Sequence, residues 1–311
     1  MEIGIIGLGK MGGNISLQCI DKDIIVVGKD IKERPDLEQK GVIMTTEYGE
    51  FTNNLQQPRI IFLSLPAGNT IDNVIEELLS YLDKGDVLLD GGNSYYKDFQ
   101  RRYSELKNKK IHFIDCGTSG GWEGARYGAC FMVGGDKEAV KICEPILRTL
   151  SVENGYLHCG PSGSGHYVKL VHNGIEFGML QAIGEGIELL RKGEFDLNLA
   201  DIFKMYSNVS VIRSWLVELM EQALNEQEHL EDIPAYVEDT GEVNWLVQEA
   251  INKEIPIPVI TQSIIELFKS REKPKDTYRA IAMMRHGFGG HPYGKNEYVS
   301  KERKTSRIKK I

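Results

Sequence analysis

The 311-residue sequence has no long hydrophobic run, no excess of basic residues and few cysteines, and each lack excludes a class of protein. No stretch approaches the roughly 20 apolar residues that are needed to cross a bilayer. Glycines interrupt the N-terminus where a signal peptide would carry its apolar region. We therefore expect a cytoplasmic protein without a membrane partner. The formal net charge of -8 argues against nucleic acid as a partner.

The five cysteines are scattered, with no Cys-x-x-Cys pair and no histidine pair at metal-ligand spacing beside them. They are Cys19, Cys116, Cys130, Cys143 and Cys159. We expect reduced, mostly packed thiols and no bound metal. The one basic run, from Lys301 to Lys310, is short and terminal, and we interpret it as a solubilising tail.

The chain length and the 41% hydrophobic content are large enough for two cores, so we expect two domains. In the first half, short β-rich segments alternate with helical stretches, which is typical of a parallel sheet covered by helices. The predicted strands are Ile3–Ile6, Ile24–Gly28, Ile60–Leu65, Val87–Asp90, Ile111–Asp115 and Phe131–Val133. The predicted helices among them include Thr70–Leu82 and Tyr95–Lys107.

Strand patterns fade after residue 165, and helical periodicity takes over. The predicted helices there are Tyr167–Arg191, Leu199–Ser207, Val211–Leu224, Val243–Asn252, Pro258–Lys269 and Tyr278–Met284. Glycine and serine cluster between Pro161 and Gly165, where we place the boundary. The fold class is thus α/β. A Rossmann-like, mostly parallel sheet domain over residues 1–162 is followed by an all-helical domain.

A glycine-rich turn follows the first predicted strand and has the G-x-G-x-x-G pattern, with residues Gly7, Gly9, Lys10, Met11 and Gly12. Glycines at these positions let the backbone approach a pyrophosphate at a helix N-terminus. The pattern alone would also suit an ordinary turn. The second strand, however, leads to Asp30, where an acid that binds the ribose of a dinucleotide belongs.

Asp30 favours NAD over NADP as the coenzyme. Its carboxylate can accept hydrogen bonds from a ribose 2′-hydroxyl, whereas a 2′-phosphate would be repelled by about 1 to 4 kcal/mol per charge pair near 4 Å. Lys29, Lys32 and Arg34 lie nearby and could offset this repulsion, or they could form an ordinary basic loop. Because ligands of open α/β sheets bind beyond the C-terminal strand ends, we expect further contacts at the loops that follow later strands. These contacts are Leu65, Pro66, Asn93 and the loop Thr118 to Gly121.

Four polar residues of the first predicted helix after the boundary fall on one helical stripe: Lys169, His172, Asn173 and Glu176, at i, i+3, i+4 and i+7. A lysine, a histidine, an amide and a carboxylate on one face could abstract a proton, hold a hydroxyl and return a proton. A solvated polar face is the alternative, because charged helix faces are common.

Several motifs together make the sequence resemble the short-chain form of decarboxylating 6-phosphogluconate dehydrogenase, in order and over essentially the whole chain. These motifs are the Gly7 to Gly12 turn, Asp90 to Ser94, Ser119 to Arg126, Lys169 to Glu176, and Arg285-x-x-x-Phe-Gly-Gly-His291. The resemblance implies an oxidoreductase that oxidises the 3-hydroxyl of a C6-substituted gluconate with a nicotinamide dinucleotide. Loss of CO2 then gives a pentulose, with no metal required.

The resemblance also implies a role for each matching residue. Lys169 would be the general base on the 3-hydroxyl and then an acid, helped by a pKa that desolvation lowers. Glu176 would protonate C1 of the enediol. Ser119, Gly120 and Gly121 would hold the substrate carboxylate, while His172, Asn173 and Asn93 would orient hydroxyls and nicotinamide. The resemblance also implies a helical substrate and dimerisation domain over residues 163–284. Arg285 and His291 would belong to a tail, residues 285–311, that reaches a neighbouring subunit of a homodimer or a multiple of one.

The sequence departs from the family at the residues that grip the C6 phosphate. A tyrosine, a lysine and an arginine of the family are replaced by Phe177, Asn244 and Leu267, and Arg285 alone is retained. A charge-assisted hydrogen bond contributes about 1.5 to 3 kcal/mol, so the replacement of these three side chains would weaken phosphate binding considerably.

Three interpretations of this departure stay open. Asn244 and Gln262 offer neutral donors that suit a monoanionic sulfonate, as in a 6-deoxy-6-sulfogluconate dehydrogenase branch. Lys269 or Arg271 could instead replace the missing arginine, or the helix registers could be shifted, which would leave an ordinary 6-phosphogluconate dehydrogenase. A non-catalytic nucleotide-binding sensor is a more remote alternative. Uncharged gluconate fits poorly, because Arg285 would lack an anion.

Overall fold

The computed structural model describes residues 1–227, 230–271 and 275–305. The end of the expected basic tail, residues 306–311, lies outside this range. The chain divides into two compact units, Met1–Leu170 and Val171–Ile311. The division falls inside the long helix α8 (Ser164–Lys192), a few residues after the boundary predicted from the glycine-serine cluster.

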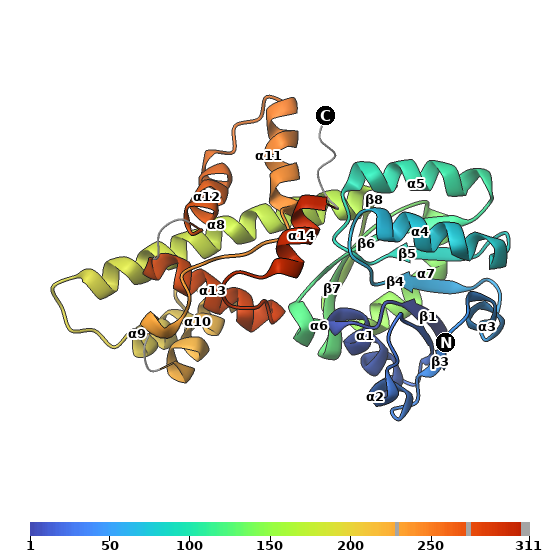
Figure 1. Ribbon diagram of the computed structural model, residues 1–311, viewed down its shortest axis with the longest axis horizontal. Coiled ribbons are helices and arrows are strands. Elements are labelled where there is room, and N and C mark those ends of the chain that lie inside the picture. The colour runs from blue at the N-terminus through green and yellow to red at the C-terminus, as the bar shows by residue number, and fades with distance from the viewer. Residues whose placement is uncertain (228–229, 272–274, 306–311) are drawn as a thin grey trace. The chain divides into compact units, whose positions relative to one another are not determined.

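The first unit contains an eight-stranded sheet with the strand order β3-β2-β1-β4-β5-β6-β7-β8 (Figure 1). All neighbouring strands pair in parallel except β6 and β7, which are antiparallel. The strands are β1 (Glu2–Ile6), β2 (Ile25–Lys29), β3 (Ile43–Thr45), β4 (Ile60–Leu63), β5 (Val87–Asp90), β6 (His112–Ser119), β7 (Ala129–Gly134) and β8 (Ser151–Gly160). The predicted Rossmann-like, mostly parallel sheet is therefore confirmed.

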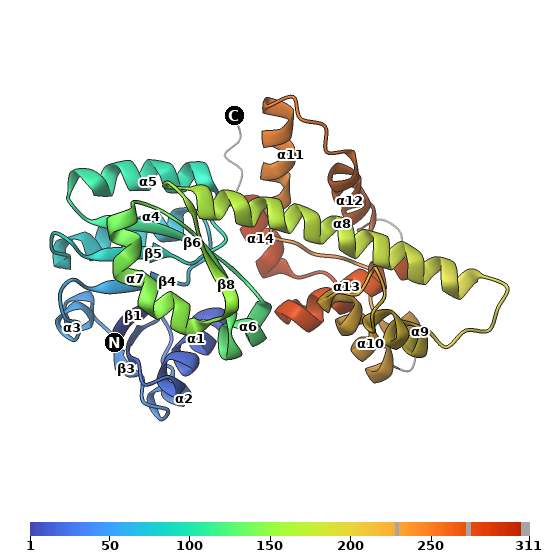
Figure 2. The ribbon, with the colours of Figure 1, turned by 180° about the vertical axis from the view of Figure 1, so that it is seen from behind.

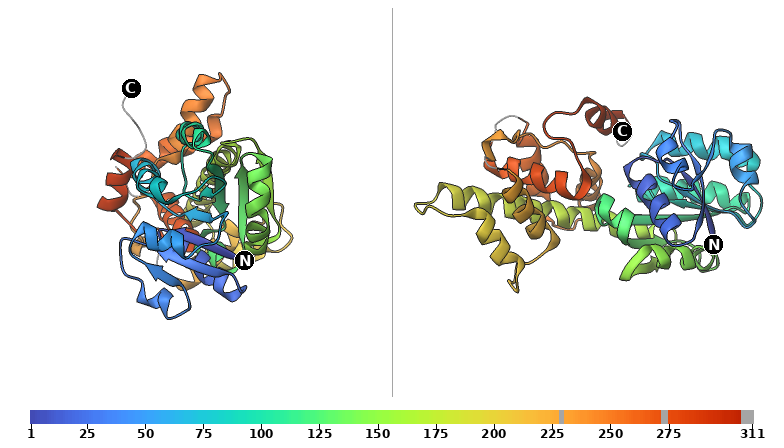
Figure 3. Two further views of the ribbon diagram at one scale, coloured as in Figure 1. Left: turned by 90° about the vertical axis from the view of Figure 1, so that its right-hand side faces the viewer. Right: turned by 90° about the horizontal axis from the view of Figure 1, so that it is seen from below.

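Helices cover both faces of this sheet, which explains why its central strands are apolar almost throughout. One core contains residues of α1, α6 and α7, and the other contains residues of α3, α4 and α5. Figure 3 shows these helical layers on opposite sides of the sheet. The helices are α1 (Lys10–Asp21), α2 (Pro35–Glu38), α3 (Tyr48–Asn53), α4 (Asn69–Leu78), α5 (Tyr96–Asn108), α6 (Gly121–Tyr127) and α7 (Lys137–Leu150).

Side chains of one strand alternate between these two cores because successive residues of a strand point to opposite faces. In β1, Ile3 and Ile5 pack into the core with α1, whereas Ile6 packs into the core with α4. Burial on both sides fixes the strand register, since a slip of one residue would exchange the two faces. The C-terminal ends of β1, β4, β5 and β6 consequently lie next to one another along one edge.

The second unit is helical throughout the residues that the structure describes (Figure 2). After α8 come α9 (Leu199–Ser207), α10 (Trp215–Glu226), α11 (Glu242–Asn252), α12 (Pro258–Lys269), α13 (Asp276–Gly289) and α14 (Glu297–Thr305). This confirms the predicted all-helical second part. None of the helices in the described parts of the chain is both long enough and apolar enough to cross a membrane.

Candidate active site

The glycine-rich turn joins β1 to α1 and has the geometry that a bound dinucleotide requires. Gly7 has a φ of +90°, and a Cβ atom on Gly12 would lie 1.9 Å from the Gly7 carbonyl oxygen. Side chains are therefore excluded at both positions, so that the turn packs closely against the start of α1. A Cβ on Gly9 would meet nothing within 4 Å, which leaves open space for a ligand at the helix N-terminus.

The Asp30 carboxylate closes this turn. One carboxylate oxygen accepts a hydrogen bond from the Leu8 amide at 2.5 Å, and the other accepts one from the Lys32 amide at 2.9 Å. A surface pocket of about 540 Å³ opens beside Asp30, and its lining also includes Leu8, Gly9 and Lys10. Residues of the turn and the acid thus line one pocket, whose volume lies in the range of small-molecule and cofactor sites.

Two of the three basic residues near Asp30 are held by other partners. The Arg34 guanidinium donates to both oxygens of Asp36, at 2.8 and 2.6 Å, and these bonds lower the pKa of the Asp36 carboxyl. The Lys29 ammonium donates to the Thr46 carbonyl and lies 4.6 Å from the centre of the Tyr48 ring. Neither is oriented as a dedicated partner for a 2′-phosphate.

The other predicted coenzyme and substrate loops follow strands that are neighbours in the sheet. Leu65 and Pro66 come after β4, Asn93 comes after β5, and Ser119 ends β6. Gly120 and Gly121 follow Ser119 with φ values of +112° and +62°. The backbone therefore makes a tight turn at these two residues, where α6 begins. This conformation suits a nest of backbone amides, which could hold the substrate carboxylate that the family resemblance assigns to these residues.

Helix α8 contains all four residues of the predicted catalytic stripe. A Cβ atom on Gly117 of β6 would lie 2.6 Å from the Lys169 Cβ, so the base of the Lys169 side chain touches the strand that leads to Ser119. His172 Nδ1 lies 3.1 Å from Asn173 Oδ1 and 3.9 Å from a Glu176 carboxylate oxygen. Asn173 is buried, while Lys169, His172 and Glu176 are half-buried.

The residues at the expected C6 end divide into two groups. Phe177 and Arg285 are both buried, and the Arg285 guanidinium lies 5.1 Å from the centre of the Phe177 ring. The guanidinium also donates a hydrogen bond to the Glu238 carbonyl at 3.3 Å. Leu267 is 3% exposed and belongs to the apolar interior. Gln262 is exposed and donates to Glu266 at 2.9 Å, which gives no support to its predicted contact with substrate.

Both residues that could replace the missing arginine, Lys269 and Arg271, already pair with carboxylates. Lys269 pairs with Glu266 at 2.6 Å, and Arg271 pairs with Asp239 at 2.7 Å. Asn244 is half-buried in α11. His291 follows α13, and its ring lies edge-on to Phe288 at 5.8 Å. Arg285 itself is part of α13, so the segment that we predicted to be a tail begins inside a helix of the second unit.

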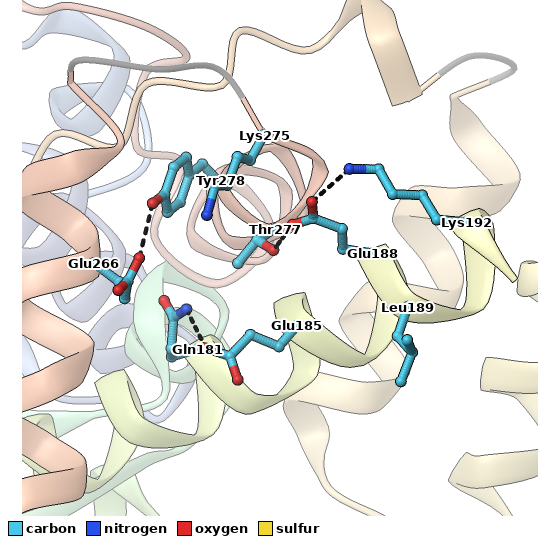
Figure 4. A pocket seen from close by; sticks show the side chains of 9 residues that line it. All are labelled: Gln181, Glu185, Glu188, Leu189, Lys192, Glu266, Lys275, Thr277 and Tyr278. Carbon is cyan, nitrogen blue, oxygen red and sulfur yellow. Dashed lines mark hydrogen bonds and ion pairs between the residues drawn. The ribbon is translucent and has the colours of Figure 1, made fainter.

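The helical unit has a pocket of about 480 Å³ that is lined mainly by polar and charged residues, and none of the predicted site residues is among them (Figure 4). Its carboxylates are bound within the chain. Glu188 pairs with Lys192 at 2.6 Å, and Tyr278 donates to Glu266 at 3.0 Å. We therefore do not assign it to the site. Among the described residues, no group of three or more histidine, cysteine or acidic side chains could hold a metal ion.

Comparisons with known proteins agree with this geometry. Residues 2–160 match the model of the NAD binding domain of 6-phosphogluconate dehydrogenase, and residues 165–308 match the model of its C-terminal domain. The chain belongs to the 6-phosphogluconate dehydrogenase family. The prediction of an enzyme of this family of NAD(P)-dependent decarboxylating dehydrogenases is confirmed, whereas the sulfogluconate branch stays a prediction.

Relatives of similar length support the same assignment. YqeC of Bacillus subtilis is 44% identical over 94% of this chain and 98% of its own. The NAD(+)-dependent, decarboxylating 6-phosphogluconate dehydrogenase of Haloferax volcanii is 38% identical over 96% of this chain and 100% of its own. The structure of Plasmodium falciparum 6-phosphogluconate dehydrogenase matches with a TM-score of 0.76 and 30% identity, over 87% of this chain and 62% of that longer chain.

Proposed function

We propose that this protein oxidises and decarboxylates 6-phosphogluconate with NAD, giving a pentulose 5-phosphate, CO2 and NADH. The observation that carries the proposal is the intact stripe of Lys169, His172, Asn173 and Glu176 on α8, with Lys169 against β6. Turnover tests it: 6-phosphogluconate and NAD should yield NADH and CO2 in equal amounts. Coenzyme binding without turnover would instead support a nucleotide-binding sensor.

The first chemical step needs a group that removes the proton of the 3-hydroxyl as hydride leaves C3. The glycine turn and Asp30 fit a nicotinamide dinucleotide, which supplies the hydride acceptor when bound. We assign the removal of this proton to the Lys169 amine. The start of the Lys169 side chain is packed against Gly117, so the amine reaches the substrate from a fixed point of attachment. His172 and Asn173 are held to each other and can orient hydroxyls from neighbouring positions.

The second step removes the carboxylate of the β-keto acid as CO2. The bond between C1 and C2 breaks, and its electron pair forms an enediol whose oxygen takes a proton back from the Lys169 ammonium. Glu176 then protonates the carbon that was C2 of the gluconate and becomes C1 of the pentulose. The amides of Gly120 and Gly121, with Ser119, would hold the carboxylate until it leaves.

The coenzyme preference should follow Asp30. We expect a higher kcat/KM with NAD than with NADP, because the carboxylate is held by two backbone amides and Arg34 is engaged by Asp36. Asp30→Ser should narrow the ratio of the two kcat/KM values by about fivefold or more, since it removes a charge repulsion of about 1 to 4 kcal/mol. Steady-state kinetics with both coenzymes measures this, with Glu38→Ser, a change of an exposed acid of α2, as the control. A wild-type preference for NADP would refute the assignment.

A second candidate substrate is a gluconate with a sulfonate at C6. Phe177 and Leu267 are buried and apolar, and Lys269 and Arg271 already pair with carboxylates. Arg285 is then the main cation at this end, and a single arginine matches a monoanion better than a dianion. The similarity to the Haloferax volcanii enzyme favours the phosphate.

We further propose a homodimer, or a multiple of one, in which the segment after α13 completes the site of a neighbouring subunit. Mixing His291→Ala with Lys169→Met subunits should then restore about half of wild-type activity in each hybrid dimer, because one of its two sites receives only intact parts. Lys169→Met mixed with Glu176→Gln is the matched control, since both changes lie on α8 and leave no intact site. Verified hybrids without activity would place His291 in its own subunit's site.

A further inference from the structure

Three buried ionisable residues of the first unit form a cluster that the proposed mechanism does not use. Asp90 ends β5 and Asp115 lies beside it in the register of β6, and neither is accessible to solvent. His166, in the first turn of α8, is 2% exposed. Two carboxylates and one imidazole therefore share one water-excluded site at the end of the sheet where the coenzyme and substrate loops begin.

Asp115 is occupied by the backbone of α8. Its two oxygens accept hydrogen bonds from the amides of Gly163 and His166, each at 2.8 Å. A carboxylate in this position satisfies amides that a helix N-terminus leaves unpaired and complements the helix dipole. The carboxylate that the His166 ring pairs with is consequently that of Asp90.

The His166 ring faces Asp90, and both side chains are excluded from water. Its Nε2 lies 3.4 Å from Asp90 Oδ2, and neither atom has a hydrogen bond to another group. The Phe99 ring stands edge-on to the imidazole at 5.4 Å. A buried carboxylate without a counter-charge is very costly, so a protonated imidazole is the group that makes this arrangement tolerable.

The groups around His166 favour its charged form. Burial alone would lower the pKa of His166, but the Asp90 and Asp115 carboxylates raise it above the ordinary value. Arg102 of α5 opposes them, and its own guanidinium pairs with Asp72 at 2.8 Å. The ion pair is therefore complete below the ordinary histidine pKa and is lost as the pH rises through the raised value.

Both partners are connected to residues of the proposed reaction. Asp90 Oδ1 accepts a hydrogen bond from the Gly92 amide at 3.1 Å, and Gly92 directly precedes Asn93. His166 lies one turn before Lys169 on α8. We propose that the buried His166–Asp90 ion pair fixes the first turn of α8 to the loop after β5 and thereby positions Lys169 and Asn93. This inference rests on the proposed function, and His166 is a positioning residue that does not touch substrate.

The kinetic test uses His166→Gln, Asp90→Asn and the double variant, with His112→Gln at the other end of β6 as the matched control. Each single change should lower kcat by about 10- to 100-fold, as expected for a catalytic group displaced by a fraction of an ångström to an ångström. KM and the Kd of NAD should change by less than about threefold. The double variant should be no slower than the slower single variant, because both changes break the same pair. The inference would be overturned if the loss in kcat of the double variant equalled the product of the two single losses. It would also be overturned if the single variants had the kcat of the wild type after correction for the fraction of folded protein.

A spectroscopic test needs no turnover and therefore stays informative if the proposed substrate is wrong. The NMR signal of His166 is identified by its absence in His166→Gln. In the wild type this signal should still be that of an imidazolium at pH values above the ordinary histidine pKa of about 6.5. In Asp90→Asn the pKa of His166 should be lower than in the wild type. The side-chain ε-carbon signal of Lys169, assigned by its loss in Lys169→Met, should shift in His166→Gln and Asp90→Asn but not in His112→Gln. A neutral His166 at pH 6, or an unmoved Lys169 signal, would refute the positioning role.

Discussion

Lys169→Met should lower kcat by about 10²- to 10⁴-fold, the usual contribution of a general acid–base group. We expect this large effect because one amine serves both steps of the proposed reaction, first as base and then as acid. Methionine keeps most of the length of the side chain and its contact with Gly117 but cannot exchange a proton. The fold and the coenzyme pocket, which lies at the glycine turn, should be unaffected.

The measurement is single-turnover NADH formation together with the Kd of NADH by fluorescence. Lys192→Met is the matched control, because Lys192 lies on the same helix and its exposed side chain pairs with Glu188 at 2.6 Å. It should retain wild-type kcat. Near-normal turnover in Lys169→Met would transfer the base to another group, and equal losses in both variants would indicate damage to α8 rather than to chemistry.

The fold was predictable where the pattern of apolar residues is regular over a whole segment. β5 and the helices α9 and α12 have the predicted bounds, because continuous apolar runs and regular helical periodicity report burial directly. The strands β3 and β8 were missed. β3 has only three residues, and β8 is an edge strand whose residues Val152 to Asn154 are exposed, so neither has the apolar pattern of a central strand.

The candidate site was predictable where its residues share one local segment. The stripe on α8 and the glycine turn each follow from spacing within a few residues. The cluster of Asp90, Asp115 and His166 could not be derived in this way, because it depends on the register between β5 and β6 and on where α8 begins. The same holds for Phe177 and Arg285, which meet although 108 positions separate them.

The enzyme should require an anionic group at C6 of its substrate for efficient turnover. We expect kcat/KM for 6-phosphogluconate to exceed that for gluconate by about 10- to 100-fold, since a charge-assisted hydrogen bond to Arg285 contributes about 1.5 to 3 kcal/mol. Arg285→Met, which removes the charge and keeps the buried volume, should remove most of this difference. A wild-type enzyme that oxidises gluconate equally well would show that Arg285 has only a structural role beside Glu238.

The ratio between phosphate and sulfonate substrates should respond to residues at the same end. Phe177→Tyr with Asn244→Lys should raise kcat/KM for 6-phosphogluconate relative to 6-deoxy-6-sulfogluconate, because a dianion benefits more from an added cation than a monoanion does. The shift should reach about 1.5 to 3 kcal/mol for each new hydrogen bond to the phosphate. Leu267→Arg is not a useful addition, because Leu267 is 3% exposed and an unpaired charge there would destabilise the fold by several kcal/mol.

The matched control for this double change is Phe203→Tyr, which adds a hydroxyl to another buried ring of the helical unit. It should leave the ratio unchanged. If the wild-type enzyme already has the higher kcat/KM with the sulfonate, the single cation Arg285 decides the specificity, and the protein is a sulfogluconate dehydrogenase. If the ratio favours phosphate and the double change does not move it, Phe177 and Asn244 lie away from C6, and Arg285 binds the phosphate without them.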